Sequence, residues 1–560
     1  MSDEADRGIP WRALAIAGLA ALLGALVAPA PWPDGSTQLL VERGREVVAD
    51  LPVNVGDTPS GTDLPFAGGS VHLPDGIPAD ARITVEVRYD APPSSDEQTT
   101  VRLELPDGRS ELVPVGATSA DGTVVEAQRW PSHSAVAVLA VLGAVVVLWV
   151  SGAIPLFVTS LAIPVVLVVS GVGSPTAALS NFFHPIIALF LAGFLMAEAM
   201  RRTGLDHLAA ISMIARAGRS PVALFAAMIG TSAFLSMWMS NTAAAAVLLP
   251  IAIAITAPLE SPAYRRAVVL GIAYAATLGG VGSAIGTPAN PLAIAFLDDF
   301  VGRRISFVEW FAIGLPMVLL FLPILGAYLW WRMGASPDGA RFADARRVAQ
   351  AELRATGRPT RDQLTVMAVF VAVIAVWLAE PLHGIETGIV ALGGAVVLAL
   401  LRRIEPDDLN RISWSSLLTF GGGLTLGVFL VESGTSDWIA TRLAVLSAVP
   451  GPVAVAAVAT VSLLLTTVAS NTAAAAMLIP LAIPLATIVG VDPVLLVLVV
   501  AVASSIDFAL VIGTPPTLLA YSTRLFTAGE IFRIGVVLDL VGLVLLVTVV
   551  AWLWQMLGIA

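Results

Sequence analysis

Long apolar runs separated by short polar segments make up most of the chain. From residue 134 to the C-terminal end these runs are repeatedly about 20 residues long, the length that a helix needs to cross the hydrocarbon core of a bilayer. The 560 residues are enough for roughly ten or more crossings. The pattern therefore predicts an all-α polytopic membrane protein.

The N-terminal region departs from this pattern. Residues 1–31 hold one apolar run of spanning length, which we interpret as a retained first transmembrane helix or signal anchor, with a cleaved signal peptide as the alternative. Residues 32–133 are polar, and stretches such as 83–89 (ITVEVRY) alternate hydrophobic and polar positions. This period of two predicts a small antiparallel β domain. With the first helix starting inside, that domain is extracytoplasmic.

Charge is concentrated in the same region. The net charge is -11, and residues 33–133 contain 17 acidic side chains against 7 arginines. The rest of the chain is nearly balanced, and because lysine is absent every fixed positive side chain is an arginine. We interpret the acidic segment as a passive spacer or cap, with a sensing or partner-binding role as the alternative. The absence of cysteine excludes disulfides and thiolate metal sites.

Three arginine clusters orient the remaining helices, because cytoplasmic loops of membrane proteins carry an excess of positive side chains. The clusters follow apolar helices that we predict near 182–200, 311–331 and 385–401. The middle cluster lies in residues 332–363, a predicted cytoplasmic linker. This linker separates a first half of the membrane region from a second half.

The two halves are residues 134–331 and 364–560. The arginine clusters share one side of the membrane only if residues 221–260 enter and leave the bilayer on the same face. Residues 452–487 must do the same from the opposite face. The arrangement therefore predicts two re-entrant hairpins in oppositely inserted halves.

One heptapeptide occurs twice, at the predicted tips of these hairpins. SNTAAAA stands at 240–246 and again at 470–476. Each copy is followed by an apolar helix broken by glycine, threonine and proline, at 279–290 (GGVGSAIGTPAN) and 504–517 (SSIDFALVIGTPPT). The spacing from SNT to GTP is 46 residues in the first copy and 43 in the second. Together with the topology, this similarity predicts inverted repeats.

The duplicated polar segments predict a binding cavity. Non-helical backbone at membrane depth is tolerated only where it lines a cavity, because unsatisfied peptide groups are costly in lipid. Serine, asparagine and threonine offer hydrogen-bond donors and acceptors, and the start of the helix behind each tip favours an anion. No arginine is near either tip, so we expect co-bound cations. Close helix packing through small residues is the alternative.

The same segments can supply a cation site in each half. Gly286 and Gly513 give the broken helices backbone freedom, and Ser236 and Thr466 each lie four residues before a tip serine, on the same helical face. Carbonyl and hydroxyl oxygens are suitable ligands for Na⁺. We therefore expect one Na⁺ site beside the anion in each half.

Asp507 is a further candidate functional residue, outside the duplicated motifs. It lies seven residues before Thr514 and aligns with Gly280 of the first copy. An intramembrane carboxylate is costly and usually functional. We consider a role in cation coupling or protonation, with a hydrogen-bonded structural role as the alternative.

These motifs resemble those of the divalent anion/sodium symporters, also called the solute carrier 13 family. The resemblance covers residues 134–558 and rests on the SNT tips, the IGTP segments at 285–288 and 512–515, and the stretches SAFLSMWMSNTAAAAVLLPIA and LTFGGGLTLGVFLVESG. It implies about eleven transmembrane helices, a homodimer and an elevator motion. It also implies Na⁺-coupled symport of a small divalent anion, such as succinate, citrate or sulfate, across the plasma (inner) membrane.

The resemblance further implies the binding residues. The substrate contacts would be Ser240, Asn241, Thr242, Thr287, Ser470, Asn471, Thr472, Thr514 and Pro515. One Na⁺ site would use Ser236, Ser240, Asn241 and Gly286, and the other Thr466, Ala469, Asn471 and Gly513.

Three other functions remain open: an anion exchanger of the same fold, a cation/proton antiporter, and a membrane sensor that does not transport. An enzyme is not expected, because the five histidines show no metal-ligand spacing and no phosphate-binding Gly-Lys-Ser/Thr loop is present. We interpret the arginine-rich linker as a positive-inside segment against the lipid bilayer, not as a nucleic-acid site. No organic cofactor is expected.

Overall fold

The computed structural model describes residues 11–27, 35–43, 46–55, 61–66, 69–73, 83–89, 99–104, 110–113, 115–118, 124–129, 132–217, 220–334 and 339–560. The chain forms two compact units. The smaller unit consists of Met1–Leu148, Ala162–Ala178 and Thr425–Ala444. The larger unit consists of Trp149–Leu161, Leu179–Leu424 and Val445–Ala560.

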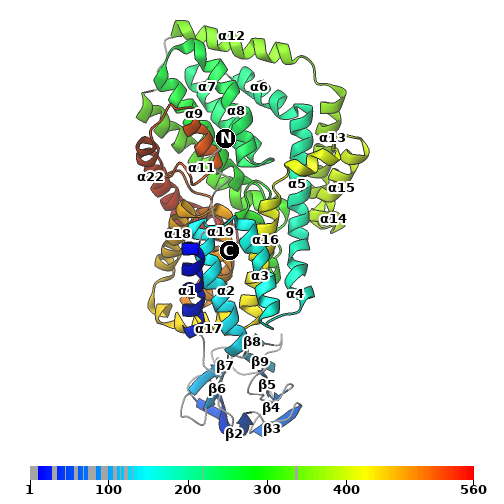
Figure 1. The fold of residues 1–560 in the computed structure, drawn as a ribbon, viewed down its shortest axis with the longest axis vertical. Coiled ribbons are helices and arrows are strands. Elements are labelled where there is room, and N and C mark those ends of the chain that lie inside the picture. The colour runs from blue at the N-terminus through cyan, green and yellow to red at the C-terminus, as the bar shows by residue number, and fades with distance from the viewer. Residues whose placement is uncertain are drawn as a thin grey trace. The chain divides into compact units, whose positions relative to one another are not determined.

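The smaller unit contains two antiparallel β-sheets in its described part (Figure 1). One sheet has the strand order β2-β1-β6-β7 and the other β3-β4-β5-β9-β8. The strands are β1 (Gly35–Arg43), β2 (Glu46–Val55), β3 (Thr62–Phe66), β4 (Gly69–Leu73), β5 (Ile83–Tyr89), β6 (Thr99–Glu104), β7 (Ser110–Val113), β8 (Val115–Thr118) and β9 (Val124–Arg129). An antiparallel β-rich segment was predicted here.

The alternation predicted for 83–89 is confirmed in β5. Val85 and Val87 are fully buried, whereas Glu86 and Arg88 point to the other face and form an ion pair of 2.6 Å. Successive side chains of a strand point to opposite faces of the sheet. The polar and apolar positions of the sequence therefore set which face of the strand is covered.

The smaller unit also contains α1 (Trp11–Val27), most of α2 (Ser132–Ser151), the second part of α3 (Leu156–Val169), the end of α16 (Trp414–Glu432) and α17 (Thr435–Arg442). Small residues allow close helix contacts, as is common in membranes. A Cβ atom added to Gly143 of α2 would lie only 2.7 Å from the carbonyl oxygen of Ala20 in α1. The α1–α2 contact therefore depends on this glycine.

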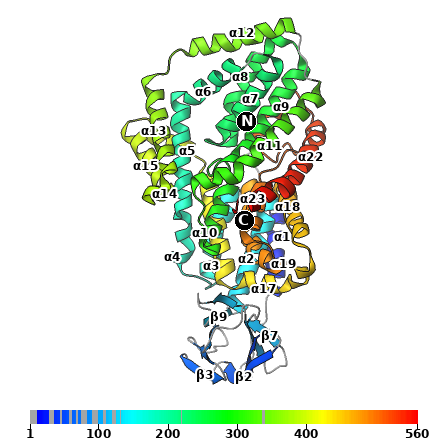
Figure 2. The ribbon, with the colours of Figure 1, turned by 180° about the vertical axis from the view of Figure 1, so that it is seen from behind.

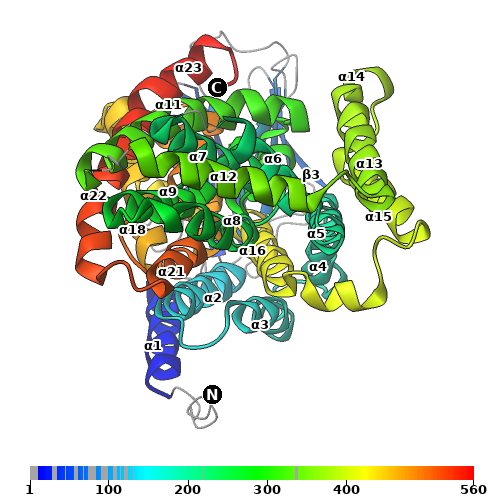
Figure 3. The same ribbon diagram turned by 90° about the horizontal axis from the view of Figure 1, so that it is seen from above.

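Helix α4 (Pro175–Ser180) is divided between the two units, and the larger unit also includes the end of α2 and the start of α3. Its other helices before residue 357 are α5 (Pro185–Thr203), α6 (Leu205–Ala217), α7 (Pro221–Ser236), α8 (Asn241–Thr256), α9 (Pro262–Gly279), α10 (Ala289–Val301), α11 (Phe307–Met333) and α12 (Gly339–Thr356). Helices α7 and α8 form a hairpin that packs on α9, and α12 lies across α6 and α8 (Figures 1 and 3).

After residue 360 the larger unit contains α13 (Arg361–Leu378), α14 (Glu380–His383), α15 (Thr387–Leu400), the start of α16, α18 (Gly451–Val468), α19 (Asn471–Val489), α20 (Pro493–Ala503), α21 (Pro515–Ser522), α22 (Ala528–Leu545) and α23 (Ala551–Met556). Helices α18 and α19 form a second hairpin, which packs on α20. Helices α13 and α15 lie beside α5 instead (Figures 2 and 3).

Helix lengths support a multi-pass membrane protein. Among the described residues, nine helical segments are long and apolar enough to cross a membrane, and four more are apolar but only 10–17 residues long. The helices before the two SNT tips differ in length: α7 is one of the short apolar helices, whereas α18 is one of the nine that are long enough to cross a membrane. The total of eleven crossings stays a prediction.

Candidate substrate and cation site

The two SNT tripeptides begin the second helix of each hairpin. Ser240 is the N-cap of α8, and its hydroxyl oxygen accepts a hydrogen bond from the Ala243 amide at 3.2 Å. Ser470 caps α19 in the same way, accepting from the Ala473 amide, also at 3.2 Å. Serine is a preferred cap because its oxygen satisfies a helix N–H group that has no partner inside the helix. Both tip serines therefore cap the helix that follows them.

The first broken helix is held open by a buried asparagine. Helix α9 ends at Gly279, and α10 starts at Ala289 after an irregular segment. The fully buried Asn290 donates from its side-chain amide to the carbonyls of Gly280 at 3.0 Å and Ser283 at 2.7 Å. These contacts replace helical hydrogen bonds that the break removes.

The second broken helix is held by different groups. Helix α20 ends at Ala503 and α21 starts at Pro515. At the position equivalent to Asn290 stands Thr517, whose hydroxyl lies 2.9 Å from that of Thr514. The backbone of this segment is held instead by Asp539 of α22, which accepts a hydrogen bond from the Phe508 amide at 2.9 Å. The two breaks are therefore similar in position and different in their supports.

The tips and breaks surround one cavity of about 420 Å³, which we call the chamber. It lies within the larger unit. The first half supplies Ser240, Asn241, Thr242, Ile285, Gly286, Thr287 and Pro288, and the second half supplies Ser470, Asn471, Thr472, Gly513, Thr514, Pro515 and Pro516. Among the described residues that line it, none carries a charge.

All nine residues implied as substrate contacts line the chamber. Of the implied Na⁺ ligands, the lining includes Ser240, Asn241, Gly286, Asn471 and Gly513. Ser236, Thr466 and Ala469 lie behind it, and all three are buried. The structure therefore brings the two sets together; their roles in binding remain predictions.

Each hairpin places oxygen atoms close together just behind the chamber. In the first half, the Ser236 hydroxyl lies 2.6 Å from Asn241 Oδ1 and 2.6 Å from the Ala276 carbonyl oxygen. In the second half, the Thr466 hydroxyl lies 2.9 Å from Asn471 Oδ1 and 2.7 Å from the Ser504 carbonyl oxygen. A hydroxyl has one proton to donate. The amide and carbonyl oxygens of each cluster each have two lone pairs, so they can also be ligands of a cation.

Three parts of the chamber wall were not predicted. Leu156, Phe190 and Phe194 contribute apolar surface, and the start of α16 contributes hydroxyl groups. These groups belong to Ser413, directly before α16, and to Ser415, Ser416 and Thr419 within it. The stretch SWSS at 413–416, before an apolar run, was a possible signal, but serines at a helix start are also ordinary helix caps.

Asp507 does not line the chamber. Its side chain is fully buried and packs against Gly513, where an added Cβ atom would collide with the carboxylate. Within the described part of the chain, neither of its carboxylate oxygens has a hydrogen-bond partner. The structural alternative, a hydrogen-bonded Asp507, is therefore not found.

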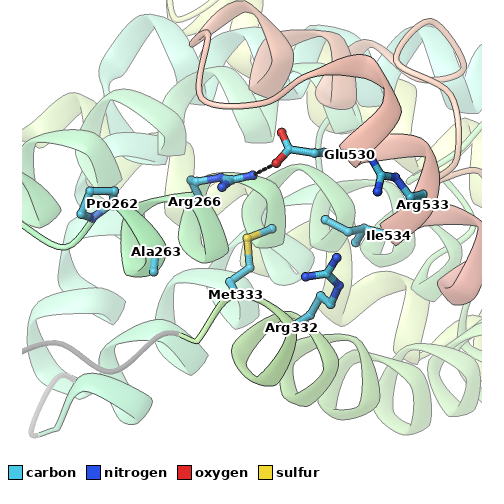
Figure 4. Close-up of a pocket in the computed structure, with 8 residues that line it drawn as sticks. All are labelled: Pro262, Ala263, Arg266, Arg332, Met333, Glu530, Arg533 and Ile534. Atoms are coloured by element: carbon cyan, nitrogen blue, oxygen red, sulfur yellow. Dashed lines mark hydrogen bonds and ion pairs between the residues drawn. The ribbon is translucent and has the colours of Figure 1, made fainter.

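A second cavity, of about 510 Å³, lies elsewhere in the larger unit, at the ends of α9, α11 and α22. Figure 4 shows its three arginines, Arg266, Arg332 and Arg533. Arg266 is already paired with Glu530 at 2.7 Å and lies over the ring of Phe526. It is lined by the N-terminal parts of α9 and α22 and by the last turn of α11, in contrast to the SNT tips and helix breaks around the chamber. We therefore consider the chamber the better candidate for a transport site.

The fold and the site define a membrane transporter, and comparison with known proteins places it in a family. The family model described as "Citrate transporter" matches residues 146–501 and 374–559. The chain belongs to this citrate transporter family. The resemblance to divalent anion/sodium symporters is thereby confirmed.

Similar proteins include the sodium-dependent dicarboxylate transporters SdcS of Staphylococcus saprophyticus and Staphylococcus aureus. The first is 30% identical over 417 residues, covering 70% of this chain and 80% of the relative. The second, from strain MRSA252, is 30% identical over 420 residues with the same coverage. These relatives are transporters and not enzymes.

Two solved transporter structures are more distant. The YdaH transporter of Alcanivorax borkumensis has a TM-score of 0.48 and 14% identity, covering 68% of this chain and 88% of its own. MtrF of Neisseria gonorrhoeae has a TM-score of 0.48 and 14% identity, covering 67% and 83%.

Proposed function

We propose that this protein is a secondary active transporter that couples the inward movement of Na⁺ to symport of a small divalent anion. The anion is a C4-dicarboxylate such as succinate, or citrate or sulfate, and it binds in the chamber. The observation that carries the proposal is the convergence of both SNT tips and both helix breaks on one uncharged cavity. The sodium-dependent dicarboxylate transporters among the relatives support Na⁺ coupling and a dicarboxylate substrate.

The chamber is suited to an anion despite its lack of charged side chains. The starts of α8 and α19 border it through Ser240 and Ser470. A helix N-terminus carries roughly half a positive charge and presents N–H groups that bind carboxylate or sulfate oxygens. This compensates only part of a double negative charge, so cations are required nearby.

The oxygen clusters behind each tip are suited to Na⁺. Their ligands are hydroxyl, amide and carbonyl oxygens, which are the hard ligands used for this ion in transporters. The proposed first site comprises Ser236, Ser240, Asn241 and Gly286, and the second comprises Thr466, Ala469, Asn471 and Gly513. A cation in each cluster lies beside the anion and attracts it, which couples the two binding events.

The proposal includes a transport motion. We propose that α7–α8 and α18–α19 are re-entrant hairpins of inverted repeats, and that they move with the chamber as one body in an elevator mechanism. Helices α5, α13 and α15, which pack together, then belong to a static scaffold that forms a homodimer. The protein acts in the plasma (inner) membrane, with residues 32–133 outside the cytoplasm.

Uptake into proteoliposomes tests the function. The purified full chain should accumulate labelled succinate, or show competition by citrate or sulfate, when Na⁺ is outside and K⁺ inside. Uptake that requires preloaded unlabelled anion indicates an exchanger, and Na⁺ flux exchanged for protons without anion uptake indicates the cation/proton antiporter. Absence of flux with retained ligand binding indicates a sensor.

Paired cap variants test the site. Ser240→Ala should raise the substrate concentration at half-maximal uptake by roughly three- to tenfold, the effect of losing a typical hydrogen bond. Ser220→Ala is the matched control, because Ser220 caps α7 by the same contact, with the Ala223 amide at 3.1 Å, outside the chamber. Equal effects of both variants on substrate affinity contradict the proposed site.

A further inference from the structure

We propose that the carboxylate of Asp507 is a direct ligand of the cation in the second-half site, so that one Na⁺ site is negatively charged and the other is neutral. This inference rests on the proposed function, because it assigns a further ligand to one of its cation sites. It is carried by the equivalence of two positions, by the direction of the side chain and by the lack of a protein partner.

Asp507 and Gly280 hold equivalent positions in the two broken helices. Each lies six residues before the glycine of the GTP segment, Gly286 in the first half and Gly513 in the second. Each also packs against that glycine. A Cβ atom on Gly286 would collide with the main chain of Gly280, and one on Gly513 would collide with the Asp507 carboxylate.

The first half shows where a side chain at this position points. A Cβ atom added to Gly280 would lie 2.5 Å from Asn241 Oδ1 and 2.9 Å from the Gly286 carbonyl oxygen. Both oxygens belong to the proposed first Na⁺ site. A side chain at the equivalent position of the second half is therefore directed to the cluster around Asn471 and Gly513.

The carboxylate has no other compensation in the described part of the chain. Both oxygens of Asp507 lack a hydrogen-bond partner, and the side chain is 0% exposed. Asp539, the other buried acid in this region, accepts from the Phe508 amide and therefore has a structural role. A buried carboxylate without a partner is strongly unfavourable, and carboxylate oxygen is a preferred ligand of hard cations. A bound cation explains why the Asp507 carboxylate is buried and has no hydrogen-bond partner.

Thermal unfolding of the purified full chain in detergent, titrated with NaCl at constant ionic strength with choline chloride, tests the proposal without substrate. A ligand that binds only the folded protein raises Tm with its concentration. Asp507→Asn keeps the side-chain size and removes the charge. It should raise the Na⁺ concentration at half-maximal stabilisation by roughly tenfold or more, because a charge-assisted ligand is lost.

The direction of the change in Tm without Na⁺ distinguishes a cation ligand from a structural group. A buried carboxylate without its cation destabilises the Na⁺-free protein. In the absence of Na⁺, Asp507→Asn should therefore have a Tm equal to or higher than that of the wild type. An equal drop in Tm with and without Na⁺ overturns the proposal. So does an unchanged Na⁺ midpoint. Asp507→Gly, which reproduces the first-half residue, provides a second variant with the same expected shift.

Asp492→Asn is the matched control. Asp492 is the N-cap of α20, accepting from the Val494 amide at 2.7 Å, and asparagine caps equally well. This variant should leave the Na⁺ midpoint unchanged. If the wild type itself shows neither Na⁺-dependent stabilisation nor Na⁺-driven uptake, the proposed function fails. If the wild type shows both and Asp507→Asn shifts neither, only the present inference fails.

Discussion

At the scale of single residues, the site is built from side chains that are small or absent. Gly286 packs against the main chain of Gly280 with no room for another carbon atom. A Cβ atom added to Gly280 would lie 2.5 Å from Asn241 Oδ1 and 2.9 Å from the Gly286 carbonyl oxygen, so both oxygens border the same position. The proposed cation ligands thus converge because two glycines touch.

Gly286→Ala should consequently weaken Na⁺ binding. The added methyl group meets backbone atoms, which cannot rotate away, so the loop must shift and the Gly286 carbonyl moves with it. We expect a rise of roughly tenfold or more in the half-maximal Na⁺ concentration for uptake, since small displacements of a ligating group have large effects.

Gly230→Ala is the control for this substitution. Gly230 lies within α7, and a Cβ atom there would meet nothing within 4 Å. Alanine is favoured over glycine inside a helix by roughly 0.5–1 kcal/mol, so this variant should be as stable as the wild type or more stable, with unchanged Na⁺ dependence. A normal Na⁺ response in Gly286→Ala contradicts the assigned role of that carbonyl.

The sequence was informative about residues that occur in both halves. The tip serines, the asparagines behind them and the threonines of the GTP segments could be predicted to meet, because duplication distinguishes them from ordinary small residues. Phe190 and the serines at the start of α16 could not. They line the chamber from helices without a duplicated motif, and their types are common in any apolar helix.

At the scale of elements, the broken helices need supports that replace helical hydrogen bonds. In the first break, Asn290 satisfies two carbonyls, and the Trp310 indole donates to a third, that of Val281, at 3.0 Å. In the second break, Asp539 and the Thr514–Thr517 pair take this place. The positions of the breaks could be predicted from glycine and proline; the supports could not, since Trp310 and Asp539 come from other helices.

Asn290→Ala should destabilise the protein. It leaves the Gly280 and Ser283 carbonyls buried without this donor, at about 1–3 kcal/mol for an unsatisfied buried group. We expect a lower Tm and reduced uptake. Thr517→Ala, at the equivalent position, removes one hydroxyl contact and should have the smaller effect on Tm. Equal Tm values for wild type and Asn290→Ala contradict this account of the first break.

At the scale of the whole molecule, transport moves charge. If a third Na⁺ enters together with one dianion and the two Na⁺ of the proposed sites, one net positive charge moves inward. Each charge that crosses 100 mV gains about 2.3 kcal/mol. That the chain is a multi-pass membrane protein could be predicted from its apolar runs alone, because the thickness of the bilayer sets the length of such runs. The number of Na⁺ ions per anion could not be predicted, because the same neutral oxygen ligands can form sites for different numbers of ions.

With three Na⁺ per dianion, uptake should be electrogenic. An inside-negative potential, set with valinomycin and an outward K⁺ gradient, should accelerate succinate uptake into proteoliposomes at a fixed Na⁺ gradient. Collapse of the potential with equal K⁺ on both sides is the control. Uptake that does not respond to voltage indicates a ratio of two Na⁺ per dianion, or exchange.

The hydroxyl-rich start of α16 has a consequence for how a solute is oriented. The other polar walls of the chamber come in pairs, one from each half, and a chamber built from such pairs alone accepts an elongated molecule equally well in either of two opposite directions. Ser413, Ser415, Ser416 and Thr419 come from the second half alone. We expect a lopsided solute, with an extra hydroxyl or carboxyl group at one end, to bind in a single direction, and mirror-image forms of such a compound to be taken up at different rates.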